Sequence, residues 1–258
     1  VTGAGTGVGR ACSIGLLEAG FTVVVVGRRT DKLQETIAES GANADRALAV
    51  PGDVADPQAV KDLFAQVKEK YGRLDVPFNN AGMGAPAVEM DELTFEQWKA
   101  VVDVNLSGTW RCCQVFGSAM VERGYGAIVN IGSAFSEIGN GGRVAYAATK
   151  TGVIGITRVL GVEWAPLGVR VNAVKPGYID TPMVQVTMQT GSGAEQLLAR
   201  VPQGRLGDPD EVAATIAFLL SDDASYITAE ALRIDGGNLS YGGMTPANDR
   251  PDRLDYES

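Results

Sequence analysis

Residues 2–9 read TGAGTGVG, and residues 21–27 read FTVVVVG. Gly3, Gly7 and Gly9 stand where a strand would turn into a helix, and glycines there let a pyrophosphate approach the backbone closely. The later run is continuously apolar and ends in glycine, which is typical of a strand buried on both faces. The two segments predict the first unit of a dinucleotide-binding fold, although a glycine-rich turn alone is equally often an ordinary helix start.

The alternation of apolar runs and helical patterns continues along the chain. Further strands are predicted at 47–50, 127–132, 169–174 and 231–234. Amphipathic stretches lie between them at 9–18, 31–39, 57–70, 94–122, 143–164 and 209–220. This order predicts an α/β fold, in which a doubly wound, mostly parallel, Rossmann-like sheet carries helices on both faces.

The domain is expected to be single, spanning residues 1–258, with a substrate lid at 182–202 and a polar arm at 238–258. Almost no strand precedes the glycine turn, and we interpret this as a first strand trimmed from the sequence rather than lost from the sheet. Pro77 interrupts an otherwise strand-like segment, where it removes a hydrogen-bond donor. A local irregularity is expected there.

Composition narrows the possible functions. A net charge of −9 disfavours a nucleic-acid surface or an anionic membrane as partner. No run of 18 apolar residues is present, so no membrane span is expected. Three cysteines are too few for a disulfide framework and suit reduced thiols in a cytoplasmic protein.

Histidine is absent from the chain. Its absence excludes histidine-based catalytic triads, histidine-ligated zinc and imidazole bases, and we expect no metal site. Acid–base chemistry near pH 7 must then come from a carboxyl, thiol, lysine or tyrosine with a shifted pKa.

Ser133 is followed after thirteen residues by Tyr146, and Lys150 comes four residues later. Side chains four apart lie on one helical face, so the ammonium is expected to lower the phenol's pKa. An ordinary phenol titrates near 10, and a shift of two or three units, worth roughly 1.4 kcal/mol each, would make it an acid–base group. A solvated helical face is the alternative interpretation of the pair alone.

The second strand ends at Gly27 and is followed by Arg28 and Arg29, with no carboxylate at the strand end. An acidic residue there would select NAD, whereas arginine accepts the 2′-phosphate of NADP. NADP is therefore the preferred cofactor and NAD a possible one, with exposed arginines at a helix start as the alternative. Asp53 and Val54 are candidates for the adenine edge, although an aspartate before a helix is often only a cap.

These motifs continue with NNAG at 79–82, Asn105 in VNLSG, YAATK at 146–150 and KPGYIDTP at 175–182. In this order and spacing they resemble the compact single-domain branch of the short-chain dehydrogenase/reductase family. The resemblance covers nearly the whole chain.

The resemblance implies roles for four residues. Tyr146 would be the catalytic acid–base, and Lys150 would lower its pKa and bind the nicotinamide ribose. Ser133 would hold the substrate oxygen, and Asn105, in a local helix distortion, would hold a water that links Lys150 to solvent. The residues expected to contact the cofactor, from the motifs and the resemblance together, are Gly3, Thr6, Gly7, Val8, Gly9, Arg28, Arg29, Asp53, Val54, Asn79, Ala81, Gly82, Tyr146, Lys150, Pro176, Gly177, Ile179 and Thr181.

Polar residues beside these motifs have two interpretations each. Lys175 is expected to be a solvated strand-end lysine rather than a contact to an anionic group. Glu137 and Asn140 are candidate substrate contacts or merely polar loop residues, and Tyr178 faces the pocket or packs on the nicotinamide wall.

The leading functional interpretation is an NAD(P)-dependent oxidoreductase that interconverts a secondary alcohol and a ketone. The alternatives are a non-catalytic dinucleotide-binding sensor or scaffold, a ketoacyl-thioester reductase, and a dehydratase or epimerase on the same fold. Enoyl reduction is disfavoured, because such relatives typically place tyrosine and lysine farther apart. Small residues along 143–164 and the resemblance imply a homotetramer or homodimer, and the sequence leaves the small-molecule substrate open.

Overall fold

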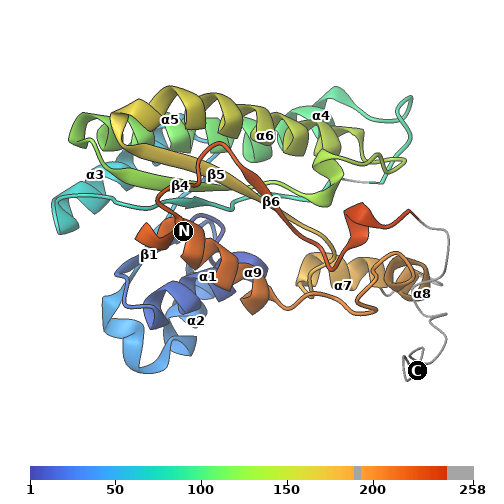
Figure 1. Ribbon diagram of the computed structural model, residues 1–258, viewed down its shortest axis with the longest axis horizontal. Helices are drawn as coiled ribbons and strands as arrows, with labels where there is room; N and C mark the ends of the chain where they lie inside the picture. Colours follow the sequence, from blue (N-terminus) through green and yellow to red (C-terminus); the bar gives the residue numbers. More distant parts are fainter. Residues whose placement is uncertain (86, 189–192, 243–258) are drawn as a thin grey trace, which may run out of the picture.

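A computed structural model of the chain describes residues 1–85, 87–188 and 193–242. The molecule has three layers, with a parallel sheet between two layers of helices (Figure 1). Helices α1, α2 and α9 cover one face, and α3, α5 and α6 cover the other (Figure 1). The predicted doubly wound α/β architecture is confirmed.

The strands are β1 (Val23–Gly27), β2 (Ala47–Pro51), β3 (Phe78–Asn79), β4 (Gly126–Ile131), β5 (Val169–Pro176) and β6 (Ala231–Ile234). β1 pairs with β2, and β3, β4, β5 and β6 pair in that order, each pair parallel. Because the strands are parallel, their carboxyl ends meet at one edge of the sheet, where ligands bind in open α/β folds.

Residues 1–4 join the two groups of strands. Thr2 forms a parallel bridge with Val26, and its backbone N–H donates to the Phe78 carbonyl at 3.1 Å. The Ala4 N–H donates to the Val26 carbonyl at 3.0 Å. This short segment therefore lies between β1 and β3, where the first strand was expected, and leads directly into the glycine turn.

Strand β3 is only two residues long, and the irregularity predicted at Pro77 is confirmed. The Pro77 carbonyl accepts from the Val129 N–H at 3.1 Å, so the segment runs beside β4. Proline has no N–H to return, and the regular ladder begins only at Phe78.

The helices are α1 (Gly7–Glu18), α2 (Thr30–Glu39), α3 (Pro57–Tyr71), α4 (Phe95–Val102), α5 (Gly108–Arg123), α6 (Val144–Trp164), α7 (Pro182–Met188), α8 (Gly193–Leu198) and α9 (Pro209–Leu220). Asp56, Thr94 and Asp208 cap α3, α4 and α9 with side-chain hydrogen bonds. The stretch 94–122, predicted as one amphipathic unit, is divided by a π-helical turn at Asp103–Ser107.

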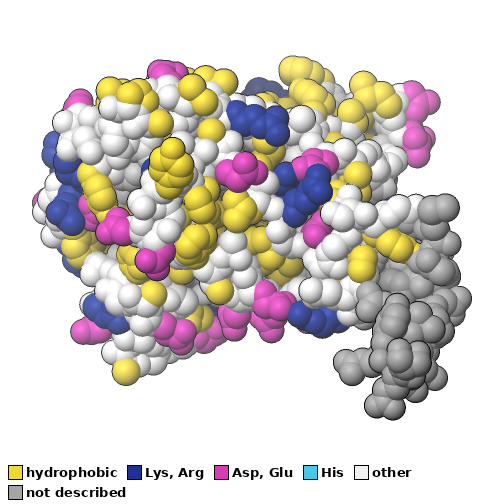
Figure 2. Space-filling view, viewed as in Figure 1, with side chains coloured by type: hydrophobic (Ala, Val, Ile, Leu, Met, Phe, Trp, Pro, Cys, Tyr) yellow, Lys and Arg dark blue, Asp and Glu magenta, His cyan; other side chains and the backbone are white. Residues whose placement is uncertain are grey.

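Apolar side chains fill the space on both sides of the sheet. Leu17, Val25 and Ile216 are fully buried on the α1 and α9 side, and Val60 and Phe116 are buried on the α3 and α5 side. Acidic side chains follow the lower edge of the face in Figure 2, near α1, α2 and α9. None of the described helices is long and apolar enough to cross a bilayer.

The predicted lid contains α7 and α8, which lie together at one end of the molecule (Figure 1). Of the predicted arm at 238–258, only a 3-10 turn at Asn238–Ser240 and the next two residues are described, and the remainder lies outside the described residues.

Candidate active site

A cavity of about 570 Å³ lies at the carboxyl edge of the sheet. The glycine turn, the ends of β4 and β5, the start of α6, and the lid helices contribute to its walls. The predicted residues that line it are Gly3, Thr6, Gly7, Val8, Gly9, Gly82, Ser133, Tyr146, Lys150, Pro176, Gly177, Ile179 and Thr181. Motifs from distant parts of the sequence thus meet around one space.

The glycine turn leaves no room for side chains. Gly3 has a φ of +66°, and a Cβ on Gly9 would lie 2.2 Å from the Gly3 carbonyl oxygen. Thr6 precedes α1 without a capping hydrogen bond from its side chain, and Gly7 and Val8 line the cavity. Since the first N–H groups of a helix have no partner within it, this turn fits a pyrophosphate.

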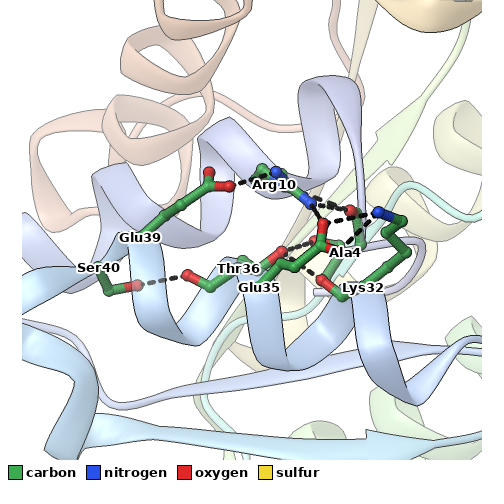
Figure 3. Close-up of polar contacts among 8 residues, drawn as sticks. Ala4, Arg10, Lys32, Glu35, Thr36, Glu39 and Ser40 are labelled. Carbon is green, nitrogen blue, oxygen red and sulfur yellow. Dashed lines mark hydrogen bonds and ion pairs between the residues drawn. The ribbon is translucent and has the colours of Figure 1, made fainter.

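Polar contacts hold the turn to α2, as Figure 3 shows. The Thr36 hydroxyl donates to the Ala4 carbonyl at 2.9 Å, and Arg10 Nη2 donates to the Gly5 carbonyl at 2.8 Å. Arg10 is itself paired with Glu35 at 3.0 Å. The backbone that would meet the cofactor is therefore fixed by contacts that a ligand need not supply.

The residues predicted to bind the adenosine end of the cofactor do not line this cavity. Arg28 is 71% exposed, and its guanidinium lies 4.0 Å from the Asp53 carboxylate. Asp53 also accepts from the Ala55 N–H at 2.9 Å, a contact within the loop before α3, whose N-cap is Asp56 and not Asp53. Arg29 is exposed at the start of α2. The Cβ and backbone of Lys32 pack against Gly5, and its ammonium is paired with Glu35.

Two predicted cofactor residues have side chains in the core instead. Val54 is 5% exposed and lies 2.7 Å from the position of a Cβ on Gly108. Asn79 is 2% exposed and donates to Asn130 Oδ1 at 2.9 Å. Backbone contacts by Asn79 to the cofactor stay a prediction.

The neighbouring Asn80 was not predicted, yet it lines the cavity and donates to the Thr2 carbonyl at 3.0 Å and the Gly3 carbonyl at 3.2 Å. Ala81 lies beside it, and its N–H donates to Thr2 Oγ1 at 3.0 Å. Successive strand residues face opposite sides, and a strand of two residues gives too short a pattern to show which one faces the site.

Tyr146 and Lys150 lie on the same face of α6, as their spacing predicts. Both line the cavity, and Lys150 Nζ lies over the Tyr146 ring, 5.7 Å from its centroid. Ser133 follows β4, and its hydroxyl oxygen accepts from the Phe135 N–H at 3.2 Å. The Phe135 ring meets Tyr146 edge to face, with the centroids 6.1 Å apart, and helps to orient the phenol.

Burial controls the protonation of this pair. Lys150 is 3% exposed and donates to the Ile131 carbonyl at 2.9 Å, and burial lowers its pKa to about 8. Burial also raises the pKa of Tyr146, although a hydrogen bond from Ser133 and the charge of Arg143 act in the opposite direction. The expected lowering of the Tyr146 pKa is therefore wrong for this structure, because the loss of hydration outweighs the nearby charges.

Asn105 lies in the π-helical turn, and the helix distortion expected there is confirmed. Its side chain does not line the cavity but bonds twice to the backbone of Met83, accepting from the N–H at 2.8 Å and donating to the carbonyl at 3.0 Å. A Cβ on Gly82 would lie 3.4 Å from Asn105 Oδ1 and 3.7 Å from Lys150 Nζ. Asn105 thus supports the cavity wall near Lys150, and its water-holding role stays a prediction.

Lys175 is buried, with 7% of its side chain exposed, and not solvated as expected. It is paired with Glu137, which Arg233 also contacts at 2.5 Å. Glu137 is therefore engaged within the protein, whereas Asn140 and Tyr178 line the cavity. The sequence gives no signal for the Lys175–Glu137 pair, because its members are 38 residues apart.

Arg143 and Arg200 also line the cavity, and neither was predicted from the sequence. Arg143 lies three residues before Tyr146, and this closeness in sequence is the one signal that could have placed it near the phenol. Arg200 follows α8 and carries no comparable signal.

Comparisons with known proteins agree with this geometry. The sequence model of a family described as Enoyl-(Acyl carrier protein) reductase matches residues 3–238. The chain is 38% identical to the 3-oxoacyl-(acyl-carrier-protein) reductase FabG of Thermotoga maritima over 239 residues, which are 92% of this chain and 95% of the relative.

Solved structures give the same result. Levodione reductase superposes with a TM-score of 0.90 at 36% identity, covering 93% of this chain and 96% of that one. A variant of actinorhodin polyketide ketoreductase with NADPH superposes with a TM-score of 0.88 at 37% identity, again covering 93% and 96%.

Proposed function

We propose that this chain interconverts a secondary alcohol and a ketone, with NADP as the preferred cofactor. The chain belongs to the short-chain dehydrogenase/reductase family, whose members use nicotinamide cofactors. It is an oxidoreductase acting on CH–OH or ketone groups. The observation that carries this proposal is the convergence of Ser133, Tyr146 and Lys150 on the cavity that contains the glycine turn.

A nicotinamide bound in this cavity would supply the hydride in the reductive direction. Tyr146 gives its phenolic proton to the carbonyl oxygen. The Ser133 oxygen accepts from the Phe135 N–H, and its O–H, which hydrogen-bonds to Tyr146 here, would turn to donate to that same substrate oxygen. The two hydroxyls together fix the carbonyl and stabilise the negative charge that develops on its oxygen.

Lys150 holds a positive charge beside the phenol. With a pKa of about 8 it is largely protonated at pH 7. One of its three N–H groups donates to the Ile131 carbonyl, which leaves two for the ribose hydroxyls of the cofactor. A raised pKa keeps Tyr146 protonated near neutral pH, which suits ketone reduction. Alcohol oxidation needs the phenolate and should accelerate as the pH rises.

Reduction of a ketoacyl thioester is the second candidate, supported by the likeness to the FabG enzyme of Thermotoga maritima. The matching family model is described by enoyl reduction. The FabG relative is named as a reductase of a 3-oxo group, and Tyr146 and Lys150 are four residues apart. Both observations favour reduction of a C=O bond over reduction of a C=C bond.

The Tyr146→Phe variant tests the proposal. Absorbance at 340 nm follows turnover over a panel of ketones, ketoacyl thioesters and polyols with both cofactors. We expect kcat to fall roughly 10²- to 10⁴-fold, as for loss of a general acid, while the Kd for NADPH stays within about twofold. A variant that keeps its full turnover would rule out Tyr146 as the proton donor.

A further inference from the structure

We propose that the substrate carries an anionic oxyacid group, a carboxylate or a phosphate, which binds to Arg143 a few bonds from the reacting carbon, with Arg200 as the second cation. This inference rests on the proposed function and names the substrate class of the same cavity.

The charge of the cavity wall is the first observation. Its described residues include three cations, Arg143, Lys150 and Arg200, and no aspartate or glutamate. The whole chain has the opposite balance, with 31 acidic and 22 basic residues. A wall of average composition would be acidic, so this cavity would attract an anion in an otherwise acidic protein.

Arg143 is the second observation. It is the N-cap residue of α6, and its side chain lines the same cavity as the Tyr146 phenol. One Nη donates to the Ala85 carbonyl, and within the described part of the chain no carboxylate pairs with it. The guanidinium therefore keeps donors for a ligand in the fork geometry that matches a carboxylate or phosphate.

Arginines elsewhere show the contrast. Arg10, Arg205 and Arg233 each form an ion pair with a glutamate. The guanidinium groups of Arg46, Arg111 and Arg170 each donate to two or more backbone carbonyls, whereas Arg143 contacts only that of Ala85 among the described residues. The charge of Arg143 opposes the rise that burial causes in the pKa of Tyr146, without reversing it. Because Arg143 and Tyr146 line the same cavity, a group bound to Arg143 would share that cavity with the carbonyl that Tyr146 protonates.

Arg200 stands on the lid side of the same cavity. Its backbone is fixed, because its N–H donates to the Leu197 carbonyl at 3.2 Å and its carbonyl accepts from Asn238 Nδ2 at 2.9 Å. The side chain is exposed, and no hydrogen bond or ion pair holds its guanidinium among the residues that the structure describes. It is free to close on an anion that Arg143 already holds.

Two other roles for Arg143 must be separated from ligand binding. One is structural, through its hydrogen bond to the Ala85 carbonyl, and the other is an effect of its charge on Tyr146 alone. Arg143→Gln separates these roles, because glutamine keeps a donor for the Ala85 carbonyl and removes the charge. Arg73→Gln, at an exposed position outside the cavity, is the matched control. Unchanged denaturation midpoints would show that both variants fold.

The experiment measures binding and turnover separately. In a Tyr146→Phe background loaded with NADPH, cofactor fluorescence gives the Kd of each probe without reaction. Acetoacetate against its methyl ester tests the carboxylate, and dihydroxyacetone phosphate against dihydroxyacetone tests the phosphate. Turnover of the same probes is measured with Tyr146 intact.

We expect the charged member of at least one pair to bind at least tenfold more tightly than its neutral partner. Arg143→Gln should weaken that member roughly 10- to 100-fold, as expected for loss of a charge-assisted hydrogen bond, and leave the neutral member unchanged. Arg73→Gln should change neither.

Equal binding of charged and neutral probes, failure of both charged probes to bind, or an equal loss for both in Arg143→Gln would overturn the anion site. Tight, Arg143-dependent binding with no NADPH oxidation of any probe would support the anion site and count against the proposed function. The two failures are therefore distinguishable.

Discussion

The charged ammonium of Lys150 is buried, and this burial lowers the free energy of unfolding. Its pKa in the folded state is about 8, below the ordinary 10.5, so between these values the unfolded chain binds more protons. The penalty is therefore complete below pH 8 and disappears as the pH rises towards 10.5. At pH 7 it amounts to about 3 kcal/mol.

We expect Lys150→Met to raise the free energy of unfolding at pH 7 by about 1–3 kcal/mol, because the lost hydrogen bond to Ile131 offsets part of the gain. The gain should shrink towards pH 10.5, and kcat should fall steeply at both pH values. Urea unfolding at the two pH values measures this, with Lys61→Met, at an exposed position, as control. A variant less stable than the unsubstituted protein at pH 7 would contradict it.

Arg28 decides the cofactor in our proposal. It is exposed and only loosely paired with Asp53, so it is available to a 2′-phosphate. Arg28→Asp should raise KM for NADPH roughly 10- to 100-fold, because one charge-assisted contact becomes a repulsion, and should improve the use of NADH. Steady-state kinetics with both cofactors provides the test, and equal kcat/KM values in the unsubstituted protein would refute the assignment.

Individual residues show what the sequence can predict. The spacing of Tyr146 and Lys150 was enough to place both on one face of a helix, because helical geometry depends only on local sequence. The direction of the Tyr146 pKa shift was not predictable, because it depends on how much water the folded chain removes from the phenol.

At the scale of elements, an ion-pair network fixes the loop that begins at Ser133. Glu137 joins this loop to Lys175 on β5 and Arg233 on β6. Burial alone would raise the pKa of Glu137, but hydrogen bonds from Lys175 and Arg233 hold it below the ordinary 4.5. The resulting stabilisation is complete above pH 4.5 and is lost as the pH falls through the lower folded-state pKa.

We expect Glu137→Gln to lower the free energy of unfolding by about 3 kcal/mol at pH 7, because Lys175 then stays buried without an opposite charge. The turnover rate should also fall, because Glu137 fixes the loop that positions Ser133. Urea unfolding from pH 7 to pH 3, compared with Glu69→Gln at an exposed position of α3, measures the effect. An unchanged midpoint at pH 7 would show that the network is not stabilising.

The boundaries of the elements were predicted unevenly. β5 and α9 follow from strong apolar patterns, whereas the π-helical turn at Asp103–Ser107 left the amphipathic pattern over 94–122 intact and was suggested only by family resemblance. Pro77 predicted an irregular strand, but it did not predict that β3 would be only two residues long.

At the scale of the molecule, helices α5 and α6 present an apolar face. Trp110 is 48% exposed, Val159 62% and Val162 70%, and a Cβ on Gly155 would meet no atom within 4 Å. A cavity of about 430 Å³ lies between the two helices on this face. We propose that a second copy of the chain packs here, in a homodimer or homotetramer, because exposed apolar surface is typical of an interface.

Val159→Glu should dissociate such an assembly, since it would bury a carboxylate in an apolar contact. Met90→Glu, at an apolar position that is 69% exposed in a loop, is the matched control and should leave the mass unchanged. Sedimentation equilibrium measures both. A mass of one chain for the unsubstituted protein would end the proposal.

The overall architecture was the most predictable level, because strand and helix periodicities recur along the whole chain and parallel pairing follows from their alternation. Contacts between distant segments were not accessible, as Lys175 and Glu137 show. Their pairing exists only after β5 has been placed beside the loop that follows β4.

Because the pKa of Tyr146 is raised, the phenol already carries the proton for the reaction before a ketone binds. Uptake of a proton from solvent would then follow the transfer and restore the phenol. In a rapid-mixing record, the decay of NADPH absorbance would precede the colour change of a pH-indicator dye. The interval between the two signals would time how quickly water reaches the emptied phenol.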